Sequence, residues 1–258
     1  MVQVQACAFT KRARSSVVER YIDIVEIRGS IPLAPIESNS TIMEIPIIYE
    51  DNNIVVIDKP AGLLVHPVTN EKNTLLDFLK TKYPKAQLVH RLDQDTSGVI
   101  VAAKNEKAYE FLKNQFLNRE IKKKYLALVH GILKDKKGII VKSISKSRKR
   151  GGSQTTAPIG KTREAITRYE VIKEFPDYSL LEISPETGRT HQIRVHLASI
   201  GHPIAGDEKY KFKRRKTIKG LNRQFLHAKY LKLSLLDGEI KEFYSELPEE
   251  LSKILKKL

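Results

Sequence analysis

The sequence has few of the residues that build cross-linked or metal-bound proteins. Cys7 is its only cysteine, which excludes an internal disulfide framework and a cysteine-rich zinc site. It has no run of about 18 uncharged apolar residues, the length that a membrane-spanning helix needs. The N-terminus also lacks a basic stub followed by an apolar segment, so a secretory signal is not expected. These absences predict a cytoplasmic protein.

Acidic residues are scarce relative to basic ones. The 258 residues include 46 Lys or Arg and 30 Asp or Glu, which gives a formal net charge of +16. The apolar content of 41% is ordinary, so the charge excess is not that of a disordered chain. A globular protein of this charge usually binds a polyanion, and nucleic acid is the commonest polyanion.

The first part of the chain differs from the rest. Residues 1–42 hold no helical or strand period beyond a few positions. Residues 29–32, Gly-Ser-Ile-Pro, are what the T-arm of a tRNA gene would encode if it were read in frame. We therefore expect residues 1–42 to be a disordered or non-native leader, with the native start at Met43. An ordinary disordered basic arm is the alternative. The folded domain is expected over 43–258.

After Met43 the sequence alternates β-rich runs with helical patterns. We expect strands at 45–50, 53–58, 99–103, 125–129, 165–175, 178–184 and 231–235, and helices after Asn73-Thr74, after Asn105, at 190–200 and at 247–258. The residues Pro176-Asp177 make a tight connection that is typical of antiparallel neighbours. Strands that arrive in neighbouring runs, with helices interspersed, predict an α+β fold around a mostly antiparallel sheet.

Two stretches are rich in basic residues and poor in acids. Eight Lys or Arg and a single acid lie between 142 and 168, and seven Lys or Arg and no acid lie between 209 and 219. A charge run is often only a solvated face, but two acid-poor clusters favour a track for phosphates. The residues expected to contact an RNA backbone are Arg148, Lys149, Arg150, Lys213, Arg214 and Arg215.

The densest cluster of reactive side chains is the segment 90–98, HRLDQDTSG, just before a predicted buried strand. Asp93 and Asp95 are suitable as a carboxylate pair for glycoside hydrolysis. His90, Asp93 and Ser97 suggest a catalytic triad, although the chain has no Gly-x-Ser-x-Gly elbow. A lone aspartate acting as a nucleophile is the third alternative. The fourth is a purely structural loop in which a side chain caps the following turn.

A second cluster occupies residues 187–207. His191 and His196 are five residues apart, which fits one helix face poorly, so no metal site is expected. Arg189 stands at the predicted start of a helix, where a cation opposes the helix dipole. A charge in that position often has a specific partner, and a carboxylate of the segment 90–98 would supply one.

The segment 90–98 resembles the H-R-L-D-x-x-T-S-G signature of the RluA family of RNA pseudouridine synthases. Three further signatures of that family appear in the family's order, at 59–67 (KPAGLLVHP), 124–131 (KYLALVHG) and 187–207. The resemblance spans about residues 45–258. The resemblance implies an α+β catalytic domain in which a mostly antiparallel sheet, flanked by helices and loops, forms a central RNA-binding cleft.

The resemblance also implies the chemistry. Such an isomerase, an intramolecular transferase, breaks the N1–C1′ bond of a uridine, turns the base and rejoins it through C5, without a cofactor or metal. Asp93 matches the catalytic aspartate, which attacks either C6 of the base or C1′ of the sugar. Arg189 matches the arginine that is expected to pair with Asp93 and to favour its ionised form.

Three further positions match residues that would contact the flipped nucleotide. Tyr125 matches the tyrosine that stacks on the uracil and that is also a candidate for helping to remove the C5 proton. Arg91 matches a residue that fills the gap left in the RNA. Ile193 or Val195 would supply the apolar wall opposite Tyr125.

The chain departs from the family pattern in two places. No S4-type RNA-binding module is recognisable in residues 1–42, and Tyr210-Lys211 replaces the family's Tyr-Gly. We expect a monomeric enzyme that acts on large ribosomal RNA, with tRNA as the alternative. A non-catalytic RNA-binding or ribosome-assembly protein on the same fold is a further alternative. It is disfavoured because a pure binder has no reason to keep Asp93, Tyr125 and Arg189 together.

Overall fold

The computed structural model describes residues 45–67, 73–147, 153–157, 160–212 and 216–258. Every described residue belongs to one compact unit, Glu44–Leu258. The expected leader, 1–42, lies outside the described residues. Across the described ranges no helix combines the length and the apolar character needed to cross a lipid bilayer.

The described unit is built from strands and a few short helices. The strands are β1 (Ile47–Glu50), β2 (Ile54–Lys59), β3 (Gln87–Leu88), β4 (Ser97–Ala103), β5 (Lys122–His130), β6 (Lys137–Val141), β7 (Ser145–Lys146), β8 (Gln154–Thr155), β9 (Ile166–Phe175), β10 (Tyr178–Pro185), β11 (Leu226–Ser234) and β12 (Ile240–Tyr244). The helices are α2 (Leu75–Lys82), α3 (Glu106–Leu117), α4 (Gln192–Ser199) and α5 (Glu249–Lys256).

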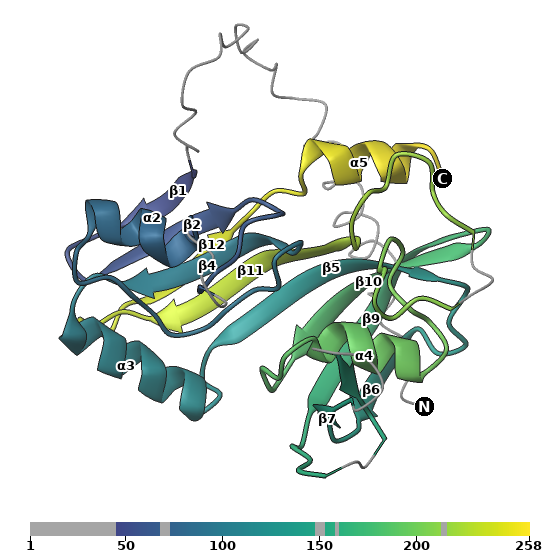
Figure 1. Cartoon of the computed structure of the whole chain (residues 1–258), viewed down its shortest axis with the longest axis horizontal. Helices are drawn as coiled ribbons and strands as arrows, with labels where there is room; N and C mark the ends of the chain where they lie inside the picture. The colour runs from purple at the N-terminus through teal and green to yellow at the C-terminus, as the bar shows by residue number, and fades with distance from the viewer. Residues whose placement is uncertain (1–44, 68–72, 148–152, 158–159, 213–215) are drawn as a thin grey trace, which may run out of the picture. The chain divides into compact units, whose positions relative to one another are not determined.

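One large sheet runs through the unit in the order β1-β2-β4-β11-β5-β10-β9-β6, with β12 paired to β11 and β3 paired to β4 (Figure 1). β7 and β8 form a separate small sheet. Within the large sheet every pairing is antiparallel except that of β4 with β11, which is parallel. The predicted α+β fold with a mostly antiparallel sheet is confirmed.

Helices α2 and α3 cover opposite faces of the β2–β4 half of the sheet. Val55 and Ile57 of β2 pack in one buried cluster with α2, whereas Ile54 and Val56 pack in another with α3. Alternate side chains of a strand point to opposite faces, so this division follows the strand period. β4, which lies between the helices, is buried along its whole length, as a strand covered on both faces should be.

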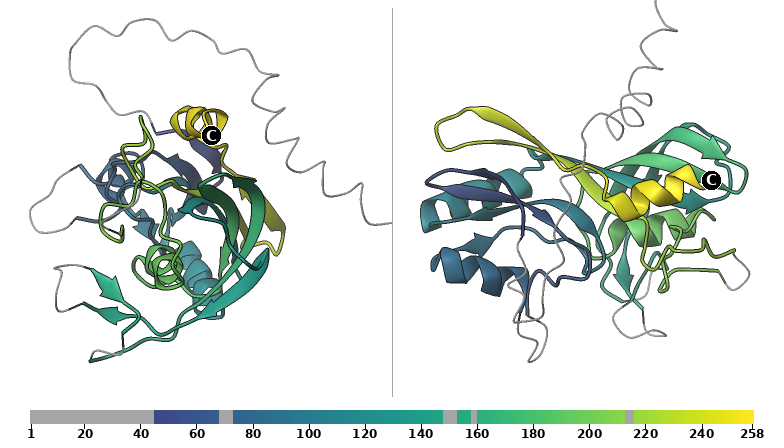
Figure 2. Two further views of the ribbon diagram at one scale, coloured as in Figure 1. Left: turned by 90° about the vertical axis from the view of Figure 1, so that its right-hand side faces the viewer. Right: turned by 90° about the horizontal axis from the view of Figure 1, so that it is seen from above.

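Helices α4 and α5 accompany the other half of the sheet (Figures 1 and 2). Ile193 and Leu197 of α4 and Leu251 and Ile254 of α5 share one buried cluster with side chains of β5 and β10. Residues 187–191 come directly before α4 in the chain. The packing of α4 on β5 and β10 therefore places these residues against β5.

Local sequence signals set several of these boundaries. Thr74 caps α2 and forms a reciprocal capping box with Asp77, and Asn105 caps α3 through Ala108. The predicted helix at 190–200 begins two residues later, at Gln192. β3, β6, β7, β8, β12 and the first half of β11 were not predicted. β6 is a short edge strand, and β12 has only one buried residue and no alternation of apolar and polar side chains, so their sequences carry weak strand patterns.

Candidate active site

Asp93 lies in the loop between β3 and β4, and the backbone of that loop is held on one side by β2. The carbonyl of Gln94 accepts the amide N–H of Gly62 at 3.0 Å and the Lys59 ammonium at 2.9 Å. Lys59 is fully buried, and its Nζ also donates to the carbonyls of Pro60 and Leu63 at 2.7 and 2.9 Å. Three acceptors match the three N–H bonds of an ammonium group, which fixes the loop beside Asp93.

The other side of the loop is held by residues 223–228. Gln224 donates to the hydroxyl of Thr96 at 3.0 Å, and Arg223 donates to the carbonyl of Asp95 at 2.9 Å and to the hydroxyl of Ser97 at 3.0 Å. Gly98, at φ +115°, lies so close to β11 that a Cβ there would be 2.2 Å from the carbonyl oxygen of Ala228. The Thr-Ser-Gly part of the segment therefore serves to dock the loop.

A Ser–His–Asp triad within residues 90–98 is not present. Ser97 is hydrogen-bonded to Nδ1 of His227 at 3.0 Å, deep in the protein. His90 instead stacks on Phe116, with ring centroids 4.7 Å apart, and its Nε2 accepts the amide N–H of Val101 at 3.0 Å. Burial lowers the pKa of His90 to about 3, so this histidine is neutral and anchors the loop.

Asp93 is paired with Arg194, a residue of α4. Arg194 donates from Nη1 to Oδ2 of Asp93 at 2.9 Å, and its Nε and Nη2 donate to the two oxygens of Asp207 at 2.7 and 2.9 Å. The Asp207 side chain is 1% exposed, against 9% for Arg194 and 16% for Asp93. The guanidinium is thus clamped by a buried carboxylate while its remaining edge holds Asp93. The two carboxylates together raise the pKa of Arg194 despite its burial.

The prediction that Arg189 pairs with Asp93 is therefore wrong. Arg189 precedes α4 and its Nε donates to the carbonyl of Glu164 at 3.1 Å. Because the helix begins at Gln192, Arg189 does not sit on the helix start that suggested the pairing. The signal for Arg194 was available in the sequence, since an arginine between Ile193 and Val195 in an apolar helical segment needs a carboxylate partner.

Tyr125 lies in β5 between β10 and β11 and lines the same pocket as Asp93. Burial, together with the negative charge of Asp93, raises the pKa of this phenol, so Tyr125 is neutral at physiological pH. Ile193 and Leu226 also line the pocket. Val195 is instead buried in a separate cluster with Ile144, which leaves Ile193 as the candidate for the apolar wall.

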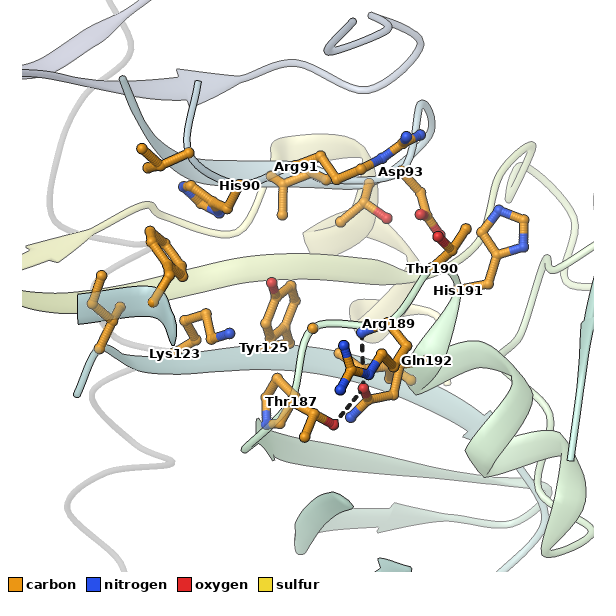
Figure 3. Close-up of a pocket in the computed structure, with 18 of the residues that line it drawn as sticks. His90, Arg91, Asp93, Lys123, Tyr125, Thr187, Arg189, Thr190, His191 and Gln192 are labelled. Carbon is orange, nitrogen blue, oxygen red and sulfur yellow. Dashed lines mark hydrogen bonds between the residues drawn. The ribbon is translucent and has the colours of Figure 1, made fainter. Parts of the chain in front are cut away.

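The pocket has a volume of about 570 Å³ and is rich in cations (Figure 3). In this view Asp93 and His191 lie toward one end, His90 and Lys123 toward the other, and Tyr125 between them. Arg91 is exposed at its edge. The basic residues that line it are Arg91, Lys113, Arg119, Lys123, Arg189 and Arg194. Such a lining attracts an anionic ligand.

His191 is a lining residue that the sequence did not single out for this role. It adopts a left-handed backbone conformation, φ +53°, directly before α4. The Tyr210 hydroxyl accepts the amide N–H of Gln154 at 2.8 Å and is hydrogen-bonded to Nδ1 of His191 at 2.9 Å. Burial lowers the pKa of His191, which favours its neutral form.

The six residues predicted to contact an RNA backbone lie outside the described residues: Arg148, Lys149, Arg150, Lys213, Arg214 and Arg215. Parts of the same basic stretches are described. There Lys142 donates to the carbonyl of Ser199 at 3.1 Å, and Lys216 pairs with Asp177 at 3.0 Å. These two lysines therefore have partners within the fold.

Comparison with known proteins agrees with this geometry. The family described as RNA pseudouridylate synthase matches residues 53–199. An uncharacterized RNA pseudouridine synthase of Bacillus subtilis, YlyB, is 40% identical over 227 residues, which cover 84% of this chain and 73% of that protein. Ribosomal large subunit pseudouridine synthase D of Haemophilus influenzae is 36% identical over 230 residues, with coverages of 82% and 70%. The chain belongs to the RNA pseudouridine synthase family.

A solved structure supports the same assignment. Human RNA pseudouridylate synthase domain containing 4 superposes with a TM-score of 0.69 at 27% identity, over 83% of this chain and 92% of that one. The predicted family and enzyme class are thus confirmed. The protein is an isomerase that converts uridine to pseudouridine in RNA.

Proposed function

We propose that this enzyme modifies uridines of large-subunit ribosomal RNA and that Asp93 is its nucleophile. The observation that carries the role of Asp93 is its hydrogen bond to the clamped guanidinium of Arg194, at 2.9 Å, in a pocket that also holds Tyr125. A neighbouring cation stabilises the ionised carboxylate, and the ionised form is the one that attacks.

The reaction needs no net change of atoms. The N1–C1′ bond breaks, the C5–C1′ bond forms, C5 loses a proton and N1 gains one. Asp93 would form a transient bond either to C6 of the base or to C1′ of the sugar, and that bond breaks again before release. A carboxylate at one end of a cationic pocket suits both routes, because each develops charge near the Arg194 guanidinium.

The other pocket residues would position the flipped nucleotide. Tyr125 and Ile193 would hold the uracil between them, with Tyr125 stacking as a neutral ring, since its raised pKa disfavours the phenolate that proton removal requires. Arg91, exposed at the edge of the pocket, would occupy the space that the base leaves in the RNA. Flipping costs a few kcal/mol and costs least at an unpaired uridine.

Ribosomal RNA is favoured as the substrate because several relatives are named ribosomal large subunit pseudouridine synthases. The test is incubation of the purified protein with unmodified large-subunit rRNA and, separately, with unmodified tRNA, followed by mapping of pseudouridine. We expect modification of one or a few rRNA positions. Modification of tRNA alone would contradict the proposed substrate while leaving the enzyme class intact.

We propose further that residues 43–258 form the catalytic domain and that the enzyme acts as a monomer. The described residues that line the pocket lie between His66 and Leu226, which supports a catalytic domain over 43–258. A chain that begins at Met43 should modify the same uridine as the full chain. Loss of its activity, with folding intact by circular dichroism, would assign a role to residues 1–42.

A further inference from the structure

Lys123 lies on the same face of β5 as Tyr125. The two residues are two positions apart, and a strand rises about 3.3 Å per residue, so their side chains project side by side roughly 7 Å apart. Both line the active-site pocket, and Figure 3 shows Lys123 farther from Asp93 than Tyr125 is. The Lys123 ammonium therefore lies beyond Tyr125, farther along the pocket than the expected position of the target base.

Lys123 has no carboxylate partner within the described residues. Its ammonium is 5.6 Å from the centroid of the Phe116 ring, and a Cβ at Gly188 would lie 4.0 Å from it. Its two neighbours on β5 differ, because Lys124 pairs with Glu182 at 2.8 Å and Lys122 is exposed. A partly buried ammonium is costly without an anion, and the energetic cost is relieved if the ligand brings one.

The C-terminal end of α3 completes this part of the pocket. Leu117 is 69% exposed and lines the pocket together with Arg119. Arg119 is exposed and has a left-handed backbone, φ +60°, and the described chain contains no carboxylate paired with it. An isolated exposed leucine needs no explanation. An exposed apolar side chain in the same pocket as two cations without a carboxylate partner is a pattern that a nucleotide fits, with a base on the apolar surface and a phosphate on the charges.

We propose that Lys123, Arg119 and Leu117 form a subsite for the nucleotide next to the target uridine. This inference rests on the proposed function. Lys123 and Arg119 bind the phosphate that joins the two nucleotides, and Leu117 contacts the neighbouring base. The target uridine then lies at the Asp93 end of the pocket and the RNA strand leaves over the end of α3.

The test measures binding of a ten-uridine RNA at several salt concentrations, in the Asp93→Asn background so that the probe is not converted. Each lost phosphate contact should reduce the slope of log affinity against log salt by about 0.7 to 1. We expect this reduction for Lys123→Gln and for Arg119→Gln, and not for the matched control Lys122→Gln. Equal slopes for Lys123→Gln and Lys122→Gln would overturn the subsite.

Leu117 and rescue variants separate binding from folding. Leu117→Ala should weaken binding and leave the slope unchanged. Val141→Ala, at an exposed position on β6 outside the pocket lining, should change neither the affinity nor the slope. Lys123→Arg keeps the positive charge and should show the wild-type slope. A residue needed only for folding would not make the slope depend on that charge. If Lys123→Arg behaves as Lys123→Gln does, Lys123 is not a phosphate ligand.

Activity on unmodified large-subunit rRNA distinguishes the two proposals. In the wild-type background Lys123→Gln should raise KM more than it lowers kcat, because it removes a contact made equally before and during the reaction. If the wild-type enzyme modifies no rRNA, the proposed substrate fails, yet the salt slopes still report on the subsite. If rRNA is modified and the slopes do not change, only the subsite fails.

Discussion

Arg194 donates to Asp93 with the one edge of its guanidinium that Asp207 leaves free, over an Nη1–Oδ2 distance of 2.9 Å. The opposite edge is held by both oxygens of Asp207, and the centroid of the Tyr210 ring lies 5.2 Å from the guanidinium carbon. Asp207 also accepts the amide N–H groups of Lys209 and Tyr210 at 2.9 and 3.1 Å. Asp207, in the segment after α4, therefore fixes the orientation of Asp93, the candidate nucleophile, by holding Arg194.

Replacing Arg194 tests this arrangement. Arg194→Lys keeps the charge but loses the fork that contacts two carboxylates at once, so Asp93 loses its fixed orientation. We expect kcat to fall on the order of 100-fold, while the affinity for RNA changes much less. Arg189→Gln is the control, since the Arg189 side chain contacts only the carbonyl oxygen of Glu164 among the described residues. A larger loss of kcat for Arg189→Gln than for Arg194→Lys would restore the pairing that the sequence suggested.

Gly98 should tolerate no side chain. A Cβ at this position meets the carbonyl oxygen of Ala228 at 2.2 Å, and β4 and β11 would have to separate where they pair. Gly98→Ala is expected to cost about 2 kcal/mol or more in free energy of unfolding, seen as a lower midpoint in urea. Gly238→Ala is the control for backbone strain alone, because it has a similar positive φ, +88°, and open space around it. Equal losses in the two variants would contradict the close approach of the strands.

Acid should weaken the fold through His227. Its Nδ1 accepts from Ser97 and its Nε2 donates to the carbonyl of Ser245 at 3.1 Å, so both nitrogens are used by the neutral ring. Burial lowers its pKa to about 4 from the ordinary value of 6.5. The unfolded chain therefore takes up this proton first as pH falls, and stability is lost between pH 6.5 and 4 by on the order of 3 kcal/mol.

The measurement is urea unfolding of the wild type and of His227→Asn at several pH values. The wild type should be the more stable at pH 7, and the gap between the two should narrow as the pH approaches 4. A gap that stays constant over this range would show that His227 does not carry the pH dependence.

Local signals predicted much of the fold. Thr74 and Asn105 marked helix starts correctly, and the apolar run that became β4 was predicted to be buried. These features depend on residues that are close together in the sequence. The segment 90–98 was singled out as the densest cluster of reactive side chains, and the structure places its Asp93 in the pocket.

The residues that support the loop could not be predicted in the same way. Ser97 and His227 are 130 positions apart, and their contact depends on the parallel pairing of β4 with β11. Asp93 and Arg194 are separated by 101 positions. The sequence indicates that Arg194 needs a carboxylate partner but not which one. Arg189 was matched to Asp93 in part because the pattern placed the start of α4 two residues too early. Helix ends are the least certain part of such a prediction.

The most direct test of the account is the pseudouridine map of total RNA from cells in which Asp93→Asn replaces the wild-type protein. The substitution keeps the size of the side chain and removes the negative charge that attacks, so one or a few pseudouridines should disappear while the purified variant still binds RNA. Asp95 is an exposed neighbour, and among the described residues it contacts Arg223 only through its backbone carbonyl. Asp95→Asn should therefore leave the map complete. A complete map with Asp93→Asn would contradict the assignment of Asp93 as the nucleophile.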